Sequence, residues 1–281
     1  MAAQSMLVNG TATDTVSALD RGLAYGDGLF ESIRFVGASA PLWARHMQRL
    51  GEGCARLHLC APDVATLWSE ALTVSHDMRQ SVVRITLTRG VGARGYTPSP
   101  TVQSTRIVAA FALPVVAAAA YVEGVRMRMC NLRLAEQPAL AGMKHLNRLE
   151  QVLARAEWDD PDIAEGVLCA EDGRVISATM ANLFAVVDGQ LLTPALDRCG
   201  IAGVGRAEVL AVCPQARVTT LSVDALHAAG EIFLSSSVRG IVPVRSMASW
   251  EYVPGGVTRH LQQHWRELGF PVEEPACIIR H

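Results

Sequence analysis

The apolar positions in the first third of the chain follow two different spacings. β-branched and apolar residues form three short runs bounded by Gly or Pro, as buried strands do, and these runs lie at 32–36, 82–88 and 106–113. Other large apolar residues recur at spacings of four, three, four and three positions: Trp43, Met47, Leu50, Cys54 and Leu57. That spacing keeps side chains on one helical face, so it predicts a helix between the first two strands.

A second helix is predicted to begin just after Asp63. An aspartate at this position accepts hydrogen bonds from the unpaired N–H groups of the first turn, here in the segment 64–68. The first block of the chain is therefore predicted to be a small sheet with two helices.

Strand and helix patterns continue through the rest of the chain. Strands are predicted at 125–134, 167–170, 183–187 and 232–236, and helices at 146–158, 203–212 and 259–268. The segment 115–120, VVAAAA, is predicted to be a packed connection, because its apolar character is unusual for a free linker. The expected fold class is mixed α/β (α+β), with a small N-terminal α/β domain at 1–114 and a larger C-terminal domain at 121–281.

Composition limits the classes of function. With 50% hydrophobic and 19% charged residues among 281, the chain should bury a substantial core. The net charge of −2 and the absence of a basic run argue against a nucleic-acid partner. Seven scattered cysteines without a C-x-x-C pair are typical of reduced thiols, with neither a disulfide framework nor a metal site. The N-terminal residues lack the layout of a signal peptide and no apolar run reaches membrane-spanning length, so a cytoplasmic protein without membrane association is expected.

The chain uses arginine almost exclusively where a lysine or an arginine could stand. Of the 25 lysine and arginine residues, 24 are arginine and one is Lys144. Arginine stays protonated in proteins, whereas a desolvated lysine can lose its proton and attack a carbonyl group. Lys144 is therefore a candidate Schiff-base residue. The alternative is a composition that favours arginine and leaves one lysine on the surface.

Three further segments could contribute to a phosphate site. Arg49 lies on the first predicted helix, where its planar donor group would suit an anion, with Arg45 as a rival one turn earlier. The glycine-rich segment 200–206 precedes a helical run, and free N–H groups at a helix start can bind phosphate. The three serines at 235–237 could add a hydroxyl. A solvated arginine, a plain loop and a serine-rich turn are the structural alternatives. A reactive lysine together with a phosphate-binding pocket is what a protein needs to bind pyridoxal phosphate as a Schiff base.

Several motifs occur in order along the chain: D-R-G-x-x-Y-G-D-G-x-F-E at 20–31, H-M-Q-R-L at 46–50, K-H-L-N-R-L-E-Q-V-L at 144–153 and A-N-L-F at 181–184. In these motifs the chain resembles the fold-type IV pyridoxal-phosphate enzymes, the D-amino-acid aminotransferase-like fold. The motif at 144–153 and the stretch R-G-V-G-A-R-G-Y at 89–96 look most like aminodeoxychorismate lyases.

The resemblance implies a role for each matching position. Lys144 would be the Schiff-base and acid/base residue, and the cofactor phosphate would bind four others: Arg49, Val204, Gly205 and Ser237. Arg94 and Tyr96 would lie on the substrate side. The resemblance also implies a cofactor between the two domains and a homodimer whose subunits complete each other's sites.

One position departs from the family pattern. Family members usually carry a glutamate five residues before the Asn of A-N-L-F, paired with the pyridine nitrogen, and this chain has Ser177 there. A hydroxyl can hydrogen-bond this nitrogen but would hardly keep it protonated. Transamination should suffer more than elimination, so Ser177 favours a lyase. Alternatively, a neighbouring acid such as Glu171 substitutes, or the site has decayed.

The resemblance implies conversion of 4-amino-4-deoxychorismate to 4-aminobenzoate and pyruvate, a step toward folate. A fold-type IV transaminase acting on branched-chain or D-amino acids is the nearest alternative. A pyridoxal-phosphate-binding homologue without turnover is an alternative of another class.

Overall fold

The computed structural model describes residues 3, 5–98 and 103–271 and contains two compact units. The first unit comprises Met1–Pro114 with Met143–Arg148, and the second comprises Val115–Gly142 with Leu149–His281. Lys144 was expected in the larger domain, whereas in the structure its segment, Met143–Arg148, belongs to the first unit. The Phe30 N–H donates to the Lys144 carbonyl at 3.0 Å, and the Leu146 N–H donates to the Gly28 carbonyl at 3.0 Å. The lysine segment therefore extends the edge of a sheet in the first unit.

The sheet of the first unit has five antiparallel strands in the order β2-β1-β5-β4-β3. Its strands are β1 (Ser5–Val8), β2 (Thr11–Ala12), β3 (Gly28–Val36), β4 (Gln80–Thr88) and β5 (Thr105–Ala112). Its helices are α1 (Arg21–Tyr25), α2 (Trp43–Leu57) and α3 (Val64–Ser75). The three predicted strands and both predicted helices of this block are confirmed.

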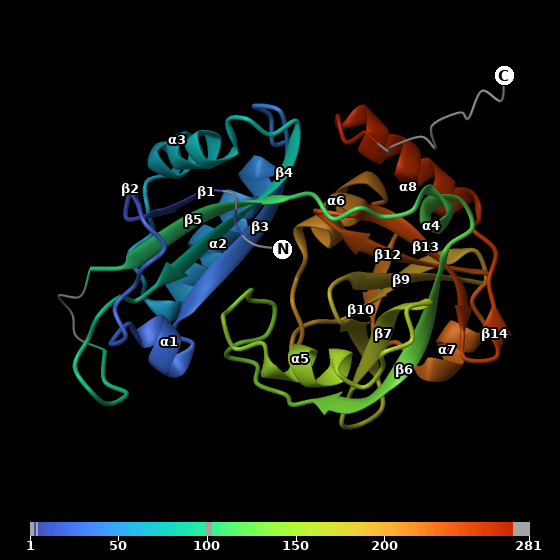
Figure 1. Cartoon of the computed structure of the whole chain (residues 1–281). Coiled ribbons are helices and arrows are strands. Elements are labelled where there is room, and N and C mark those ends of the chain that lie inside the picture. Colours follow the sequence, from blue (N-terminus) through green and yellow to red (C-terminus); the bar gives the residue numbers. More distant parts are fainter. Residues whose placement is uncertain (1–2, 4, 99–102, 272–281) are drawn as a thin grey trace, which may run out of the picture. The chain divides into compact units, whose positions relative to one another are not determined.

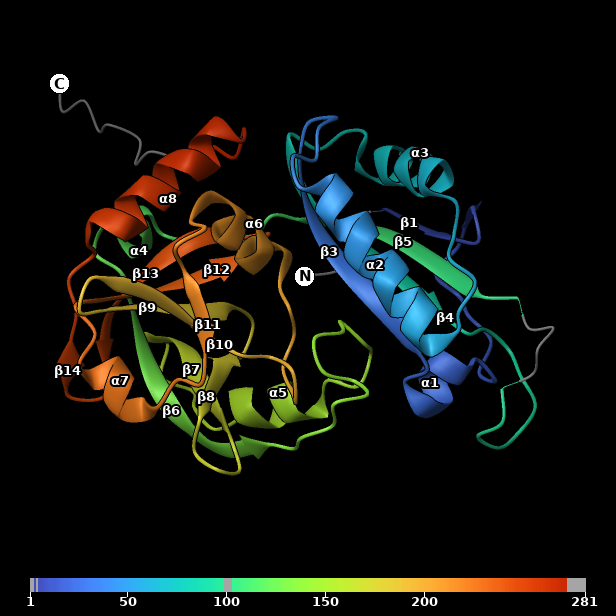
Figure 2. The ribbon, with the colours of Figure 1, turned by 180° about the vertical axis from the view of Figure 1, so that it is seen from behind.

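Helices α2 and α3 cover one face of this sheet, and Figure 2 shows α2 in front of the strands. Alternate strand residues such as Ile33 and Val83 meet Leu50 of α2 and Leu67 of α3 in one core. Asp63 begins α3 as predicted, because its carboxylate accepts the Thr66 N–H at 2.8 Å.

The second unit is built on a mixed nine-stranded sheet, drawn from green to red in Figure 1. The sheet order is β11-β10-β9-β12-β13-β6-β7-β8, with β14 paired to β13. Its strands are β6 (Val125–Leu134), β7 (Ile163–Ala170), β8 (Val175–Ala178), β9 (Asn182–Val187), β10 (Gln190–Pro194), β11 (Arg217–Thr219), β12 (Glu231–Ser236), β13 (Gly240–Met247) and β14 (Trp250–Glu251). Its helices are α4 (Ala118–Val122), α5 (Leu149–Arg155), α6 (Val204–Val212), α7 (Val223–His227) and α8 (Gly256–Glu267).

Two sequence expectations in the second unit differ from the structure. The helix predicted at 146–158 is confined to α5, because residues before it pair with β3 and residues after it form a turn. The connection predicted at 115–120 already enters α4, and the Tyr121 hydroxyl near the end of that helix donates to the Arg239 carbonyl at 2.8 Å. Among the described residues, no helix is both long and apolar enough to cross a membrane.

Candidate cofactor site and active site

The lysine lies in a partly buried, positively charged environment in the first unit. Its Nζ is 4.3 Å from the centre of the Phe30 ring. Burial first, and then the positive charge of Arg49, lower the pKa of Lys144 to about 7; the negative charge of Glu31 opposes this shift, and two further arginines add to it. Near neutral pH a substantial fraction of this amine is therefore unprotonated, as nucleophilic or base chemistry requires.

A buried carboxylate organises the residues next to Lys144. Glu31, only 1% exposed, lies on β3 and accepts Arg49 Nε at 2.8 Å and Arg49 Nη2 at 2.5 Å. The Nδ1–H of buried His46 donates to the same carboxylate at 2.6 Å. Burial alone would raise the pKa of Glu31, but the charge and hydrogen bonds of Arg49 and the bond from His46 lower it to about 2. Burial lowers the pKa of His46. Glu31 thus holds the Arg49 guanidinium in a fixed orientation.

In the second unit, the start of α6 has the geometry of an anion site. The Asn182 side chain accepts the Gly203 N–H at 3.0 Å and donates to the Ile201 carbonyl at 2.9 Å, which fixes the loop before the helix. A Cβ on Gly205 would lie 2.9 Å from the Ser236 carbonyl carbon, so only glycine fits there. The N–H groups of the first helical turn, including those of Val204 and Gly205, have no partner within the helix.

The loop after β12 lies against this helix start. The Ser236 hydroxyl accepts the Val238 N–H at 3.2 Å and the Arg239 N–H at 3.0 Å, so this serine shapes the loop itself. Ser237 follows it, half-buried on the same loop. Within the second unit, the structure therefore brings together three of the predicted phosphate ligands: Val204, Gly205 and Ser237.

Ser177 lies on β8, opposite Leu168 of β7, and is 8% exposed. Among the described residues, none makes a hydrogen bond with its hydroxyl. Glu171, the suggested substitute acid, is exposed in the turn between β7 and β8. The buried acid of this hairpin is Glu165, which accepts hydrogen bonds from Thr179 Oγ1 and, at 3.1 Å, from Arg239 Nη1. Burial raises the pKa of Glu165.

Arg94 and Tyr96, the predicted substrate residues, lie on an exposed loop after β4 in the first unit. The Tyr96 ring packs against Tyr25, with ring centres 5.5 Å apart.

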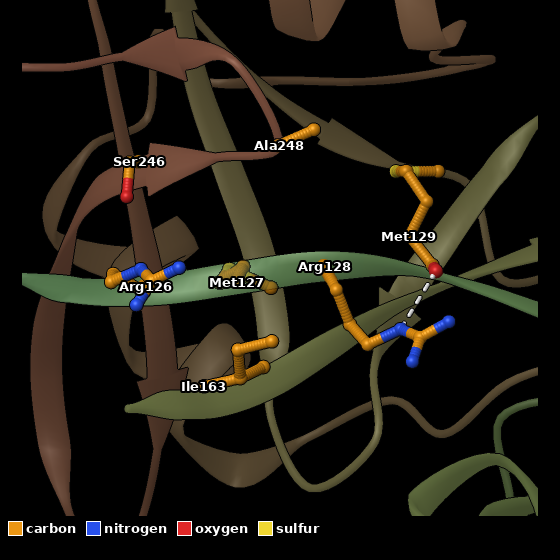
Figure 3. Close-up of a pocket in the computed structure, with 7 residues that line it drawn as sticks. All are labelled: Arg126, Met127, Arg128, Met129, Ile163, Ser246 and Ala248. Carbon is orange, nitrogen blue, oxygen red and sulfur yellow. Dashed lines mark hydrogen bonds between the residues drawn. The ribbon is translucent and has the colours of Figure 1, made fainter. Parts of the chain in front are cut away.

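A cavity of about 330 Å³ lies elsewhere in the second unit, between β6, β7 and β13 (Figure 3). None of the predicted site residues lines it. Its two arginines already have acidic partners, since Arg126 pairs with Asp162 at 3.5 Å and Arg128 with Glu157 at 3.3 Å. This cavity therefore offers no uncompensated charge for an anionic ligand.

Sequence reasoning missed the roles of Glu31, His46 and Asn182. All three stand inside quoted motifs, so the signal was present. Their roles depend on which strand face meets which helix, and the motifs alone do not give that.

A lysine with a lowered pKa, and a helix start with the geometry to bind an anion, are features of an enzyme with a phosphate-bearing cofactor. Residues 28–247 match the family model for amino-transferase class IV, and the chain belongs to that family. The aminodeoxychorismate lyase of Vibrio harveyi is 34% identical over 263 residues, which cover 91% of this chain and 97% of the relative. A putative branched-chain-amino-acid aminotransferase of Methanocaldococcus jannaschii is 29% identical over 82% of this chain and 81% of its own length.

Solved structures give the same result. The crystal structure of 4-amino-4-deoxychorismate lyase from Pseudomonas aeruginosa matches with a TM-score of 0.89 and 42% identity, covering 93% of this chain and 98% of that one. The predicted fold-type IV architecture is confirmed by this match and by the family assignment.

Proposed function

We propose that this protein is a pyridoxal-phosphate-dependent lyase that converts 4-amino-4-deoxychorismate to 4-aminobenzoate and pyruvate. The observation that carries the proposal is the Lys144 amine, whose pKa is lowered to about 7 beside the Glu31–Arg49 pair. The two lyases named above are 34% and 42% identical to the chain, whereas the aminotransferase is 29% identical. A decayed binding protein would have no need of a reactive amine.

The residues present fit pyridoxal 5'-phosphate. The first turn of α6 is suited to a phosphate, because Gly205 has no Cβ and the backbone of Ser236 can approach it closely. The guanidinium of Arg49 is suited to a phosphate as well. In our proposal Arg49, Ser237 and the N–H groups of Val204 and Gly205 bind the phosphate, and Ser177 faces the ring nitrogen. When bound, the cofactor supplies an aldehyde that condenses with amines and a ring that accepts electrons.

Lys144 moves the protons in this proposal. Its unprotonated amine takes the proton from the substrate ring carbon that bears the amino group, and the resulting ammonium returns a proton to the enolpyruvate product. Arg49 and the other nearby arginines favour the unprotonated amine electrostatically, so the base is available near neutral pH. Arg94 and Tyr96 lie on the substrate side and recognise the carboxylated ring.

We further propose a cytoplasmic homodimer. Leu19 and Leu23 are 69% and 70% exposed and, with Val91, place apolar side chains on the surface of the first unit. Exposed apolar side chains that gather into one patch are typical of a subunit interface, and we propose that these three belong to one. The described cysteines are free thiols and mostly buried, which suits a reducing compartment. Sedimentation equilibrium tests the dimer, and a monomer at micromolar concentration would contradict it.

The direct test is to incubate the cofactor-loaded protein with 4-amino-4-deoxychorismate and to quantify both products. Equal amounts of 4-aminobenzoate and pyruvate are expected. Amino-group transfer from amino acids to 2-oxoglutarate, without 4-aminobenzoate, would instead identify a transaminase. Cofactor binding with neither reaction would identify a binding protein.

A further inference from the structure

The loop 90–96, which follows β4, carries Arg94 and Tyr96 on an exposed surface of the first unit. Such a loop would ordinarily sample many conformations, and a flexible loop loses entropy when it binds a ligand. Here, however, hydrogen bonds fix the loop at its base and at its tip. Most of the side chains that make or support these bonds come from the D-R-G-x-x-Y-G-D-G segment at 20–28.

Arg21 makes the most extensive of these contacts. Its side chain is buried, with 4% of the residue exposed. Its Nη1 donates to the Gly95 carbonyl at 2.8 Å and its Nη2 donates to the Tyr96 carbonyl at 3.1 Å. Its Nε donates to Asp27 at 3.0 Å. The planar guanidinium therefore bridges two consecutive loop carbonyls and one carboxylate, a geometry that a lysine ammonium cannot reproduce.

Asp27 connects Arg21 to the end of helix α2 through Arg89. Arg89 Nε donates to Asp27 at 2.7 Å, and Arg89 Nη2 donates to the Leu57 carbonyl at 2.8 Å. Burial would raise the pKa of Asp27, but the hydrogen bonds from Arg89 and Arg21 lower it, so the carboxylate stays ionised. The loop is thus tied to the same helix that carries Arg49.

Tyr25 holds the loop tip from a second side. Its hydroxyl accepts the Gly95 N–H at 3.1 Å, so Gly95 is bound through both its N–H and its carbonyl. Gly95 has a φ of +108°, which glycine adopts readily and other residues do not. Tyr96 follows it and is 86% exposed, although its ring packs against Tyr25.

The base of the loop is fixed by Asp20. This buried carboxylate accepts the Thr88 hydroxyl at 3.0 Å, and the Thr88 hydroxyl in turn accepts the Gly90 N–H at 2.9 Å. The Arg21 N–H donates to the Gly90 carbonyl at 2.9 Å. The backbone of the loop is therefore held at both ends while its recognition side chains remain exposed.

We propose that Arg21 is a positioning residue that fixes the 90–96 loop, so that Arg94 and Tyr96 are held ready to bind a carboxylated substrate. This inference rests on the proposed function for the identity of the substrate. Preorganisation lowers the entropic cost of substrate binding and leaves the chemistry at Lys144 unaffected. Loss of Arg21 should therefore raise KM far more than it lowers kcat.

The test compares Arg21→Lys with Arg106→Gln, using holoenzyme in each case. Arg106 forms a two-bond pair with Glu70, at 2.7 and 2.6 Å, in the same unit, and in the described part of the chain neither side chain bonds to the 90–96 loop. It therefore controls for the loss of an arginine–carboxylate pair. Arg21→Lys should raise KM for 4-amino-4-deoxychorismate about tenfold or more, with kcat and cofactor affinity nearly unchanged. In Arg21→Lys, trypsin should cleave after Arg94 several times faster than in the wild type. Arg106→Gln should change neither KM nor the rate of cleavage after Arg94.

An unchanged KM and an unchanged cleavage rate in Arg21→Lys would overturn the inference. So would an equal effect of Arg106→Gln, because the role would then be general stability. If the wild-type protein makes no 4-aminobenzoate, the proposed function fails, and the cleavage rate after Arg94 still decides whether Arg21 fixes the loop.

Discussion

The two clusters that we propose to bind the cofactor, one in each unit, are built by different physical means. Around Lys144 the cluster consists of charged side chains: Glu31 and His46 are buried, the half-buried Arg49 bonds to Glu31, and their interactions shift pKa values. At the start of α6, backbone geometry does the work, through the Gly205 contact with Ser236 and free first-turn N–H groups. Proton transfer requires an amine whose pKa is adjusted to the working pH, whereas binding an anion requires only well-placed hydrogen-bond donors.

The test with the largest expected effect removes the Lys144 amine. Lys144→Ala should lower the rate of 4-aminobenzoate formation by at least about 10³-fold, because both the nucleophile and the base are lost. Lys144→Arg keeps a positive charge but no reactive amine, and it should be equally inactive. Both variants should retain the wild-type circular dichroism spectrum. Wild-type turnover in either variant would refute the assignment of Lys144.

The next test breaks the buried ion pair. Glu31→Gln leaves Arg49 without its buried carboxylate and should lower the free energy of unfolding by about 3–5 kcal/mol at pH 7. The pKa of Glu31 is about 2 in the folded protein, below its ordinary 4.5, so its stabilising contribution is present above pH 4.5 and is lost as pH falls toward 2. The stability difference between wild type and Glu31→Gln should shrink over that range in urea titrations.

Glu70→Gln is the matched control for that measurement. It also breaks an arginine–carboxylate pair in the first unit, yet it lies outside the predicted site. It should leave cofactor affinity unchanged, whereas Glu31→Gln should weaken it through Arg49. Equal cofactor affinity in the two variants would show that Arg49 needs no support from Glu31.

A third test addresses backbone geometry in the second unit. Gly205→Ala would place a methyl group 2.9 Å from the Ser236 carbonyl carbon, and the backbone there cannot move aside cheaply. A cost of about 1–3 kcal/mol should weaken cofactor binding about fivefold to 150-fold in equilibrium dialysis. Gly256→Ala, in the first turn of α8 with no atom within 4 Å of the added Cβ, should leave binding unchanged. Parallel behaviour of the two variants would argue against a phosphate at α6.

The comparison also shows what sequence can predict. Lys144 stands out because it is the only lysine, and the Val204–Gly205 pair stands out because glycine precedes an apolar helix. The Glu31–Arg49 pair could not be predicted, because it depends on β3 turning alternate residues toward α2. The helix at 146–158 was predicted too long because apolar periodicity does not reveal that the Leu146 N–H bonds to the Gly28 carbonyl beside an isolated β-bridge. Local patterns are visible in sequence, whereas tertiary pairing is decided by distant partners.

The smallest expected effect concerns Ser177, the proposed partner of the ring nitrogen. Ser177→Glu would introduce a carboxylate at a residue that is 8% exposed, and in the proposed site this would favour a protonated ring nitrogen. Transamination depends on that protonation more than elimination does. Amino-group transfer to 2-oxoglutarate should therefore rise severalfold, while the lyase rate changes little.

Ser177→Ala separates the hydroxyl from the added charge, since it removes the hydroxyl without adding an acid. It should lower cofactor affinity slightly and leave amino-group transfer at the wild-type level. If transfer is unchanged or lower in Ser177→Glu, then the serine does not explain a preference for elimination. The cause would then have to lie at Arg94 and Tyr96, the residues that we propose for substrate recognition, on the loop that Arg21 binds.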